Sequence, residues 1–372
     1  MAGGSTFTWQ HALRLDSTKS PFTSPLPQTH QAFKGVKPVS WKRHNIGGLL
    51  VTIYGQDELP QHPSEIVCMW LLHGRGDTQD SMAYTAAGLL NAWNGYRQGK
   101  GEGVKGLVCV CFDQRNHGSR LIENNNNVSW KQGNPTHGPD MFSTYSGTAH
   151  DLSLLITQID FYLPYKISSH ICGGVSLGGH ASWIALMKEP RIKAGLIIVG
   201  CPDYVRLMTD RAIRSKVPST LTTEPPGRDF LGSRDFPQSL VAAVEQYDPA
   251  GILLSELDVY GANDHEHTPS EEEVARLKPI LERTLAGKNV MCLSGGKDRL
   301  VPHAQSKIFL NWLKRATHTE SGWAKEQNIQ LTDIVDPDAG HEFSKTMRDH
   351  AERWIIDYLS SDNDREERHS KL

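Results

Sequence analysis

Short runs rich in apolar residues alternate with stretches of helical spacing along most of this chain of 372 residues. The apolar runs lie at 66–72, 106–112, 167–172, 194–199, 290–293 and 329–335. The stretches of helical spacing lie at 82–96, 149–163, 177–187 and 348–359. Strands buried on both faces are nearly continuously apolar, and parallel strands need crossover connections, usually helices. The alternation therefore predicts an α/β fold with a doubly wound, mostly parallel sheet.

The segments outside this alternation divide the chain. Alternating apolar residues on either side of Gly47 predict a β-hairpin. A Pro-rich and then acidic stretch interrupts the pattern and indicates an inserted cap instead of a second core. We expect an irregular N-terminal arm at 1–38 and an α/β core in two parts, 39–200 and 290–360. A cap at 201–289 lies between those parts, and a polar tail follows at 361–372.

The charge balance excludes several classes of partner. Lys and Arg number 39 and Asp and Glu 42, which gives a formal net charge of −3. We therefore expect neither nucleic acid nor an anionic membrane surface as a partner. Since no apolar stretch approaches the roughly 20 residues of a membrane helix, and the N-terminus lacks signal-peptide features, we also expect no membrane span and no secretion.

No motif predicts a cofactor or a metal ion. Residues 101–106 match G-x-G-x-x-G, but they precede an expected strand, whereas a dinucleotide-binding loop follows a strand and opens a helix. Residues 264–267, Asp-His-Glu-His, are of types that bind metal ions, but their spacing does not suit one tetrahedral centre. We interpret them as a solvated cap loop. The six cysteines mostly lie in apolar runs, so we expect core side chains instead of disulfides.

The strongest chemical motif is G-x-S-x-G at 174–178, with Ser176 between an expected strand and an expected helix. Small residues two positions before and after the serine allow strand and helix to meet in a strained turn. Such a turn exposes the serine hydroxyl above the sheet and directs the helix N-terminus at developing negative charge. The motif predicts Ser176 as a nucleophile.

An acid and a base follow in the order that a nucleophile elbow requires. Asp298 comes after the strand expected at 290–293, and His341 comes after the strand expected at 329–335. Ligand sites in open α/β sheets lie at the carboxyl ends of strands. We therefore expect Ser176, Asp298 and His341 to form a catalytic triad, with Asp264, Asp336 and Asp338 as the alternative acids.

The sequence HGRGD at 73–77 follows an early strand and can bring backbone amides opposite Ser176. Acyl transfer needs such donors because the tetrahedral intermediate concentrates charge on one oxygen. We assign the oxyanion hole to the backbone N–H groups of Arg75 and Leu177. His73 itself is expected to fix this loop.

At these motifs the chain resembles the α/β-hydrolase superfamily, over residues 39–360. The resemblance rests on HGRGD, GVSLGG at 174–179, GGKDRLVP at 295–302 and AGHEF at 339–343, with DQRNHG at 113–118 similar to the D-x-R-x-H-G loop of many members. It implies the triad and an inserted lid. More closely, the chain is similar to fungal hydrolases related to dienelactone-hydrolase-like and YitV-like esterases, and some relatives with peroxisomal tails resemble enzymes of secondary-metabolite pathways. Ser176 is a departure, because dienelactone hydrolases use a cysteine.

Two further expectations concern the substrate contacts and the spacing between Asp298 and His341. The candidate substrate contacts are His73, Arg115 and His117; arginines in these loops could attract an acidic substrate or simply solvate the surface. The spacing between Asp298 and His341 is long for this family and suggests an extra helix around 314–327.

The expected function is that of a serine hydrolase acting on a carboxylic ester or lactone through an acyl-enzyme. One alternative is a peroxisomal acyl-CoA thioesterase, which would use the same chemistry. Another is a catalytically silent binding protein of the same fold. Small-molecule acyl compounds are the expected ligands.

The sequence ends in Ser370, Lys371 and Leu372. A C-terminal S-K-L is the address that the peroxisomal import receptor reads. We therefore expect a peroxisomal matrix protein, or a cytoplasmic one if the signal is not used.

Overall fold

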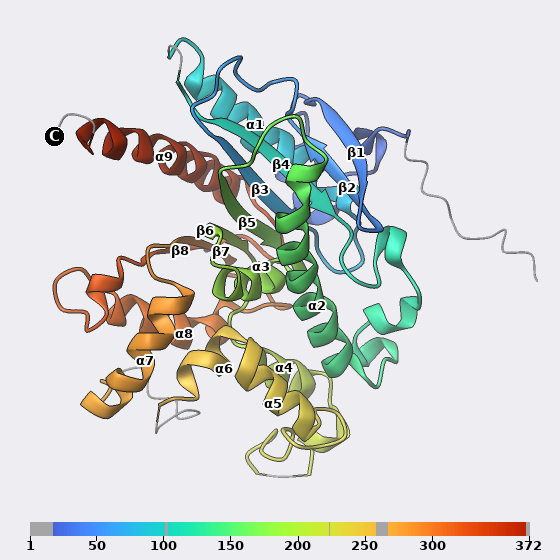
Figure 1. The fold of residues 1–372 in the computed structure, drawn as a ribbon. Helices are drawn as coiled ribbons and strands as arrows, with labels where there is room; N and C mark the ends of the chain where they lie inside the picture. The colour runs from blue at the N-terminus through green and yellow to red at the C-terminus, as the bar shows by residue number, and fades with distance from the viewer. Residues whose placement is uncertain (1–17, 101–102, 223, 258–266, 370–372) are drawn as a thin grey trace, which may run out of the picture.

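The computed structural model describes residues 18–100, 103–222, 224–257 and 267–369 (Figure 1). In this part of the chain eight strands form one sheet in the order β1-β2-β4-β3-β5-β6-β7-β8. Their bounds are β1 Trp41–Ile46, β2 Leu49–Tyr54, β3 Ile66–Leu72, β4 Gly106–Phe112, β5 Ser169–Val175, β6 Ile192–Ile198, β7 Asn289–Gly295 and β8 Gln330–Asp336. The β1–β2 and β2–β4 pairs are antiparallel and the other pairs are parallel. The mostly parallel sheet expected from the sequence is confirmed.

Helices cover both faces of the sheet. They are α1 Ala83–Arg97, α2 His137–Gln158, α3 Leu177–Lys188, α4 Tyr204–Arg214, α5 Gln238–Tyr247, α6 Pro249–Leu254, α7 Glu271–Thr284, α8 His303–Ala316 and α9 Lys345–His369. On one face α1 packs against α9, and on the other α2 packs against α3, with α8 beside it. Each face has its own cluster of buried apolar side chains, so the sheet is the middle of three layers.

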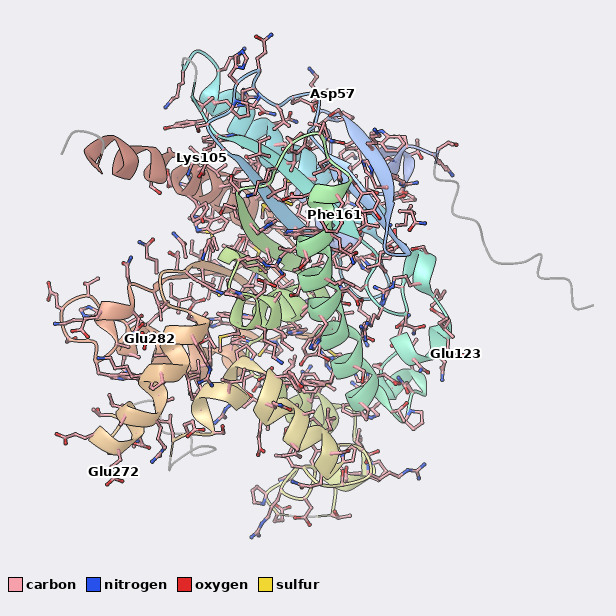
Figure 2. All side chains as sticks on the ribbon, viewed as in Figure 1. Asp57, Lys105, Glu123, Phe161, Glu272 and Glu282 are labelled. Carbon is pink, nitrogen blue, oxygen red and sulfur yellow. The ribbon has the colours of Figure 1, made fainter. Side chains whose placement is uncertain are left out.

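The segment at 201–289 contains α4 to α7, which Figure 1 shows in yellow to orange on one side of the molecule. Its buried aromatic residues belong to the same apolar cluster as α2 and α3. The Tyr204 hydroxyl, at the start of α4, donates to the Gly138 carbonyl of α2 at 2.6 Å. Outward, Glu272 and Glu282 project from α7 (Figure 2). This segment therefore packs on α2 and α3 and shares their apolar cluster.

Two helical expectations are wrong. The helix expected at 149–163 begins twelve residues earlier, because α2 spans His137–Gln158. Pro139 lies in the first turn of this helix, where a missing N–H is tolerated, so a proline at this position is compatible with the helix. The extra helix expected around 314–327 is absent from the described structure, since α8 ends at Ala316 and only a 3-10 turn, Lys325–Gln327, follows. Thr, Ser and Gly in the intervening segment favour turns over helix.

The N-terminal arm packs against the segment that follows His341. Its described part contains two short 3-10 helices, Pro21–Thr23 and Gln28–Phe33. Phe33 is fully buried against Phe343, with ring centroids 4.9 Å apart. The Thr29 carbonyl accepts from the Phe343 amide at 2.7 Å. The arm therefore anchors the segment that immediately follows His341.

The C-terminal polar segment continues α9 as far as His369, and Ser370, Lys371 and Leu372 lie outside the described residues. All six cysteines are described, buried and free. None of the described helices combines the length and the apolar character needed to cross a membrane.

Candidate active site

Ser176 occupies a strained turn between β5 and α3. Its backbone angles are φ 57° and ψ −114°, a combination that non-glycine residues rarely adopt. The Ser176 amide donates to the Ile198 carbonyl of β6 at 2.9 Å, which ties the turn to the neighbouring strand. Such strain persists only where the surrounding structure enforces it, and it is concentrated at functional sites.

The glycines that flank Ser176 have no room for side chains. A β-carbon at Gly174 would lie 2.3 Å from the backbone of Gly178, and one at Gly178 would lie 2.0 Å from the Leu72 carbonyl oxygen. The start of α3 is thus pressed against both β5 and the end of β3. This close packing is the physical reason for the G-x-S-x-G pattern.

Ser176, His341 and Asp298 are joined by hydrogen bonds although they are far apart in the sequence. His341 Nε2 lies 2.8 Å from Ser176 Oγ, and His341 Nδ1 lies 2.8 Å from Asp298 Oδ2. Asp298 Oδ1 accepts the amides of Leu300 and Val301 at 2.8 and 2.9 Å. The Asp298 carboxylate is buried while 18% of the His341 side chain is exposed. His341 is thus reachable from solvent, and the Asp298 carboxylate is held in place.

The alternative acids lie elsewhere. Asp336 accepts from the Ser344 hydroxyl at 2.6 Å, and Asp338 pairs with Lys297 at 2.8 Å. Among the described residues, His341 contacts Asp298 and Ser176 and neither of these two carboxylates. Asp264 lies outside the described residues, as do residues 265 and 266. His267, the last residue of the 264–267 segment, pairs with Glu273 at 3.0 Å. Within the described segments, no group of three His, Cys, Asp or Glu side chains is arranged to hold a metal ion.

Two backbone N–H groups lie free beside the serine. Leu177 is the first residue of α3, where an amide has no intrahelical acceptor. Gly74, the residue before Arg75, lies so close that an added β-carbon would be 3.8 Å from Ser176 Cβ. In the described part of the chain neither the Arg75 nor the Leu177 amide donates to another group. Both amides are therefore free to serve an oxygen bound at Ser176.

His73 is an internal support of this loop. It is fully buried, its Nε2 accepts from the Gln114 amide at 3.0 Å, and its Nδ1 donates to the Gly74 carbonyl at 2.7 Å. Burial lowers the pKa of His73 to about 4, so the ring is neutral. With both nitrogens engaged, His73 fixes the loop and has no atom left to contact a substrate.

The D-x-R-x-H-G loop forms a network of its own. Asp113 accepts from Gln79 and from the amide and hydroxyl of Ser119. Arg115 forms a two-pronged ion pair with Asp151, at 3.0 and 2.9 Å. His117 is buried, and its Nδ1 donates to the Arg115 carbonyl at 2.9 Å while its Nε2 has no partner. Of the expected substrate contacts, Arg115 is therefore already neutralised.

Asp77 is a further acidic group close to the site, within the motif HGRGD. Its carboxylate oxygen would lie 2.9 Å from a β-carbon at Gly74. Burial raises the pKa of Asp77 to about 6, and His341 acts in the opposite direction. The HGRGD motif predicts a role for the backbone amide of Arg75. The sequence pattern alone does not distinguish Asp77 from a solvated loop residue.

One family profile matches this chain, and several solved structures are similar to it. The profile of the alpha/beta hydrolase family matches residues 71–355. No curated protein matches the chain. The fold is similar to that of TT1662 from Thermus thermophilus, with 18% identity over 87% of this chain and 99% of that one and a TM-score of 0.49. It is also similar to the Pyrococcus furiosus esterase Pf2001, with 13% identity, 86% and 91% of the two chains and a TM-score of 0.44.

A third similar structure, the acylaminoacyl peptidase of Pyrococcus horikoshii, is longer. It shares 12% identity over 88% of this chain and 42% of its own, with a TM-score of 0.46. The family profile spans well over half of the present sequence and includes every strand from β4 to β8, together with Ser176, Asp298 and His341. The chain therefore belongs to the alpha/beta hydrolase family, and hydrolase activity is the class of function that this membership supports.

Proposed function

We propose that this protein hydrolyses a carboxylic ester or a lactone through an acyl-enzyme on Ser176. The observation that carries the proposal is the pair of 2.8 Å contacts that leads from Ser176 through His341 to the buried Asp298. A serine hydroxyl is a weak nucleophile until an adjacent base removes its proton. The two contacts provide that base and orient it.

In the first half of the reaction, Ser176 Oγ attacks the substrate carbonyl and His341 Nε2 takes the hydroxyl proton. Asp298 accepts from Nδ1, which selects the required tautomer and stabilises the imidazolium. The carbonyl oxygen becomes an oxyanion that accepts from the Arg75 and Leu177 amides. His341 then returns its proton to the departing alkoxide, which leaves an ester on Ser176.

In the second half, water attacks the Ser176 ester while His341 removes a proton from the water. The same two amides stabilise the second oxyanion. When this intermediate collapses, Ser176 Oγ leaves and recovers its proton from His341. The acid is released, and no group beyond the chain and water takes part.

A peroxisomal location is part of the proposal. It is supported by the C-terminal Ser-Lys-Leu, which the import receptor recognises. In that compartment thioesters of coenzyme A would be competing substrates for the same chemistry, so the test includes them.

The test is labelling with a fluorophosphonate, read by intact mass, followed by hydrolysis of p-nitrophenyl esters and acyl-CoAs of graded length. We expect one label on Ser176 and ester turnover that Ser176→Ala abolishes. Ser182→Ala is the matched control, because Ser182 lies on the same helix but donates to the Gly178 carbonyl at 2.8 Å. That variant should still be labelled.

Two other results of this test would change the assignment. A strong preference for acyl-CoA over esters would replace the esterase assignment with a thioesterase. If the folded protein resists labelling and turns over neither series, the proposed function is wrong.

A further inference from the structure

Asp77 is an acidic side chain beside Ser176 that has no partner in the part of the chain that the structure describes. It ends the HGRGD motif, and its amide donates to the Gly74 carbonyl at 3.3 Å, which closes a tight turn. Among the described residues the Asp77 carboxylate makes no hydrogen bond or ion pair. Its oxygens are not buried, so a ligand can reach them.

The Asp77 carboxylate and Ser176 lie beside the same glycine. Gly74 has no side chain, and the point where its β-carbon would lie is 2.9 Å from Asp77 Oδ2 and 3.8 Å from Ser176 Cβ. Both atoms are thus within 4 Å of one point. The carboxylate is therefore a close neighbour of the proposed nucleophile.

This part of the molecule is open to solvent. Ser176 and Asp77 are half-buried, and Gly76 between the motif residues is exposed. The His341 side chain is 18% exposed. A substrate that reaches Ser176 from solvent therefore comes close to an accessible carboxylate.

Two neighbouring acids differ from Asp77 because each has a partner. Asp80, three residues further along the chain, forms an ion pair with Arg43 at 2.6 Å. Asp113 accepts from the Gln79 amide at 2.8 Å. These two carboxylates stabilise their loops, whereas no such role accounts for the carboxylate of Asp77.

The proposed reaction makes an unpaired charge at Asp77 unfavourable. Burial raises the pKa of Asp77 to about 6, so the carboxylate is still charged at pH 7. The oxyanion would form at the amide of Arg75, two residues away, and like charges in a partly buried site repel each other.

The cations of the chain do not relieve this repulsion directly. The Arg75 side chain makes no ion pair with Asp77 in the described structure. His341 is the charged neighbour that acts on Asp77, but its imidazolium is paired with Asp298. A cation carried by the substrate would neutralise Asp77 and use its accessible oxygens.

We propose that Asp77 is a specificity-determining residue that binds a positively charged group of the substrate. The group is an ammonium, either quaternary or a protonated amine, carried near the ester carbonyl. The attraction between opposite charges is stronger in a partly buried site than in bulk water. The inference rests on the proposed function and narrows it: the preferred ester is cationic, and an ester that bears a carboxylate is disfavoured.

The test compares esters of the same shape that differ in charge. Acetylcholine and its carbon analogue, in which carbon replaces the ammonium nitrogen, vary the charge on the alcohol side. Betaine methyl ester and its carbon analogue vary it on the acyl side. Hydrolysis is followed by pH-stat at neutral pH, where Asp77 is charged. The readout is the ratio of kcat/KM for the cationic ester to that for the neutral one, corrected for the rates of both with hydroxide. We expect this ratio to exceed one in at least one pair.

Asp77→Asn should lower the ratio by about 10-fold in the pair that the wild type discriminates, because it removes the charge and keeps the size of the side chain. Asp77→Glu should retain part of the preference. Asp338→Asn is the matched control, since it makes the same substitution and the same change in net charge at an exposed acid that pairs with Lys297 at 2.8 Å. Its ratio should equal that of the wild type. A purely structural role of Asp77 would lower both rates together and leave the ratio unchanged, which would overturn the proposal.

The wild-type protein alone can also overturn the proposal, even if a variant does not fold. Corrected ratios at or below one in both pairs would exclude a cation subsite at Asp77. Fluorophosphonate labelling of Ser176 separates the two proposals, because the reagent is uncharged. If labelling succeeds and the cationic preference is absent, only the subsite is wrong, whereas failed labelling removes the proposed function as well.

Discussion

Gly178 lies directly against the carbonyl group of Leu72. A β-carbon at Gly178 would be 2.0 Å from the Leu72 oxygen, a separation that β-carbons essentially never show. The contact joins the start of α3 to the carboxyl end of β3. It therefore positions the turn that contains Ser176 relative to the loop that contains Arg75.

Replacing Gly178 by Ala should destabilise the protein severely. The contact is with backbone, which cannot move aside like a flexible side chain, so the cost should exceed the ~1–3 kcal/mol usual for overpacking. The measurement is the free energy of unfolding, or the soluble yield if the protein does not accumulate. Gly95→Ala in α1 is the control, because no atom lies within 4 Å of its added β-carbon. That substitution should stabilise by about 1 kcal/mol.

A second prediction concerns the acid of the proposed triad. Asp298→Asn keeps an oxygen acceptor for the Leu300 and Val301 amides but presents an NH₂ group to His341 Nδ1, which favours the wrong tautomer. We expect kcat to fall by about 10⁴-fold, as for the equivalent change in a serine protease, with little change in melting temperature. The rate of fluorophosphonate labelling reports the same loss.

Asp338→Asn is the control for that change. Asp338 is exposed and pairs with Lys297 across the same edge of the sheet, so its variant should react normally. If Asp338→Asn were inactive and Asp298→Asn active, the assigned acid would be wrong.

The strands could be predicted because burial on both faces requires runs of apolar residues that do not depend on distant contacts. β3 and β4 lie at the expected positions, and β5 and β7 differ from theirs by only a few residues. The start of α2 could not be predicted, because His137 resembles a loop residue until its contact with Arg211 of α4 is known.

Some features of the candidate site could be predicted from the sequence and others could not. Motif order along the chain indicated that Ser176, Asp298 and His341 would meet, because strand ends gather at one edge of a parallel sheet. The contacts of the arginines on α4 could not be predicted. Arg211 donates to the Leu300 carbonyl, whereas Arg206 and Arg214 pair with carboxylates, and only the folded structure distinguishes them.

The third prediction tests the proposed location. A fluorescent protein fused to the N-terminus should appear in puncta that coincide with a peroxisomal marker. Deleting residues 370–372, or adding one residue after Leu372, should move the signal to the cytosol, because the receptor reads a free C-terminal tripeptide. Glu367→Gln, which leaves the tripeptide intact, should keep the puncta. Puncta that survive the deletion would indicate a different import signal.

The fourth prediction concerns stability against acid. His30, His73 and His180 are buried, and burial lowers their pKa values from 6.5 to about 4, about 4 and about 3 respectively. Below pH 6.5 the unfolded chain binds protons at these positions and the folded chain does not, so unfolding is favoured as the pH falls. Above 6.5 both states are neutral and this contribution is absent. Each histidine should thus reduce the free energy of unfolding by about 1.4 kcal/mol per pH unit between roughly pH 6 and its folded pKa.

One substitution isolates the contribution of a single ring. His30 lies in the N-terminal arm, where its Nδ1 is 3.0 Å from the Thr85 hydroxyl, and His30→Gln retains a polar group there. Urea titrations at about pH 6 and about pH 5 should give a pH slope that is shallower by about 1.4 kcal/mol per unit than in the wild type. His62→Gln, the same substitution at an exposed position, is the matched control. An unchanged slope in His30→Gln would mean that His30 takes up its proton equally in the folded and unfolded states, which contradicts its burial as the cause of the shift.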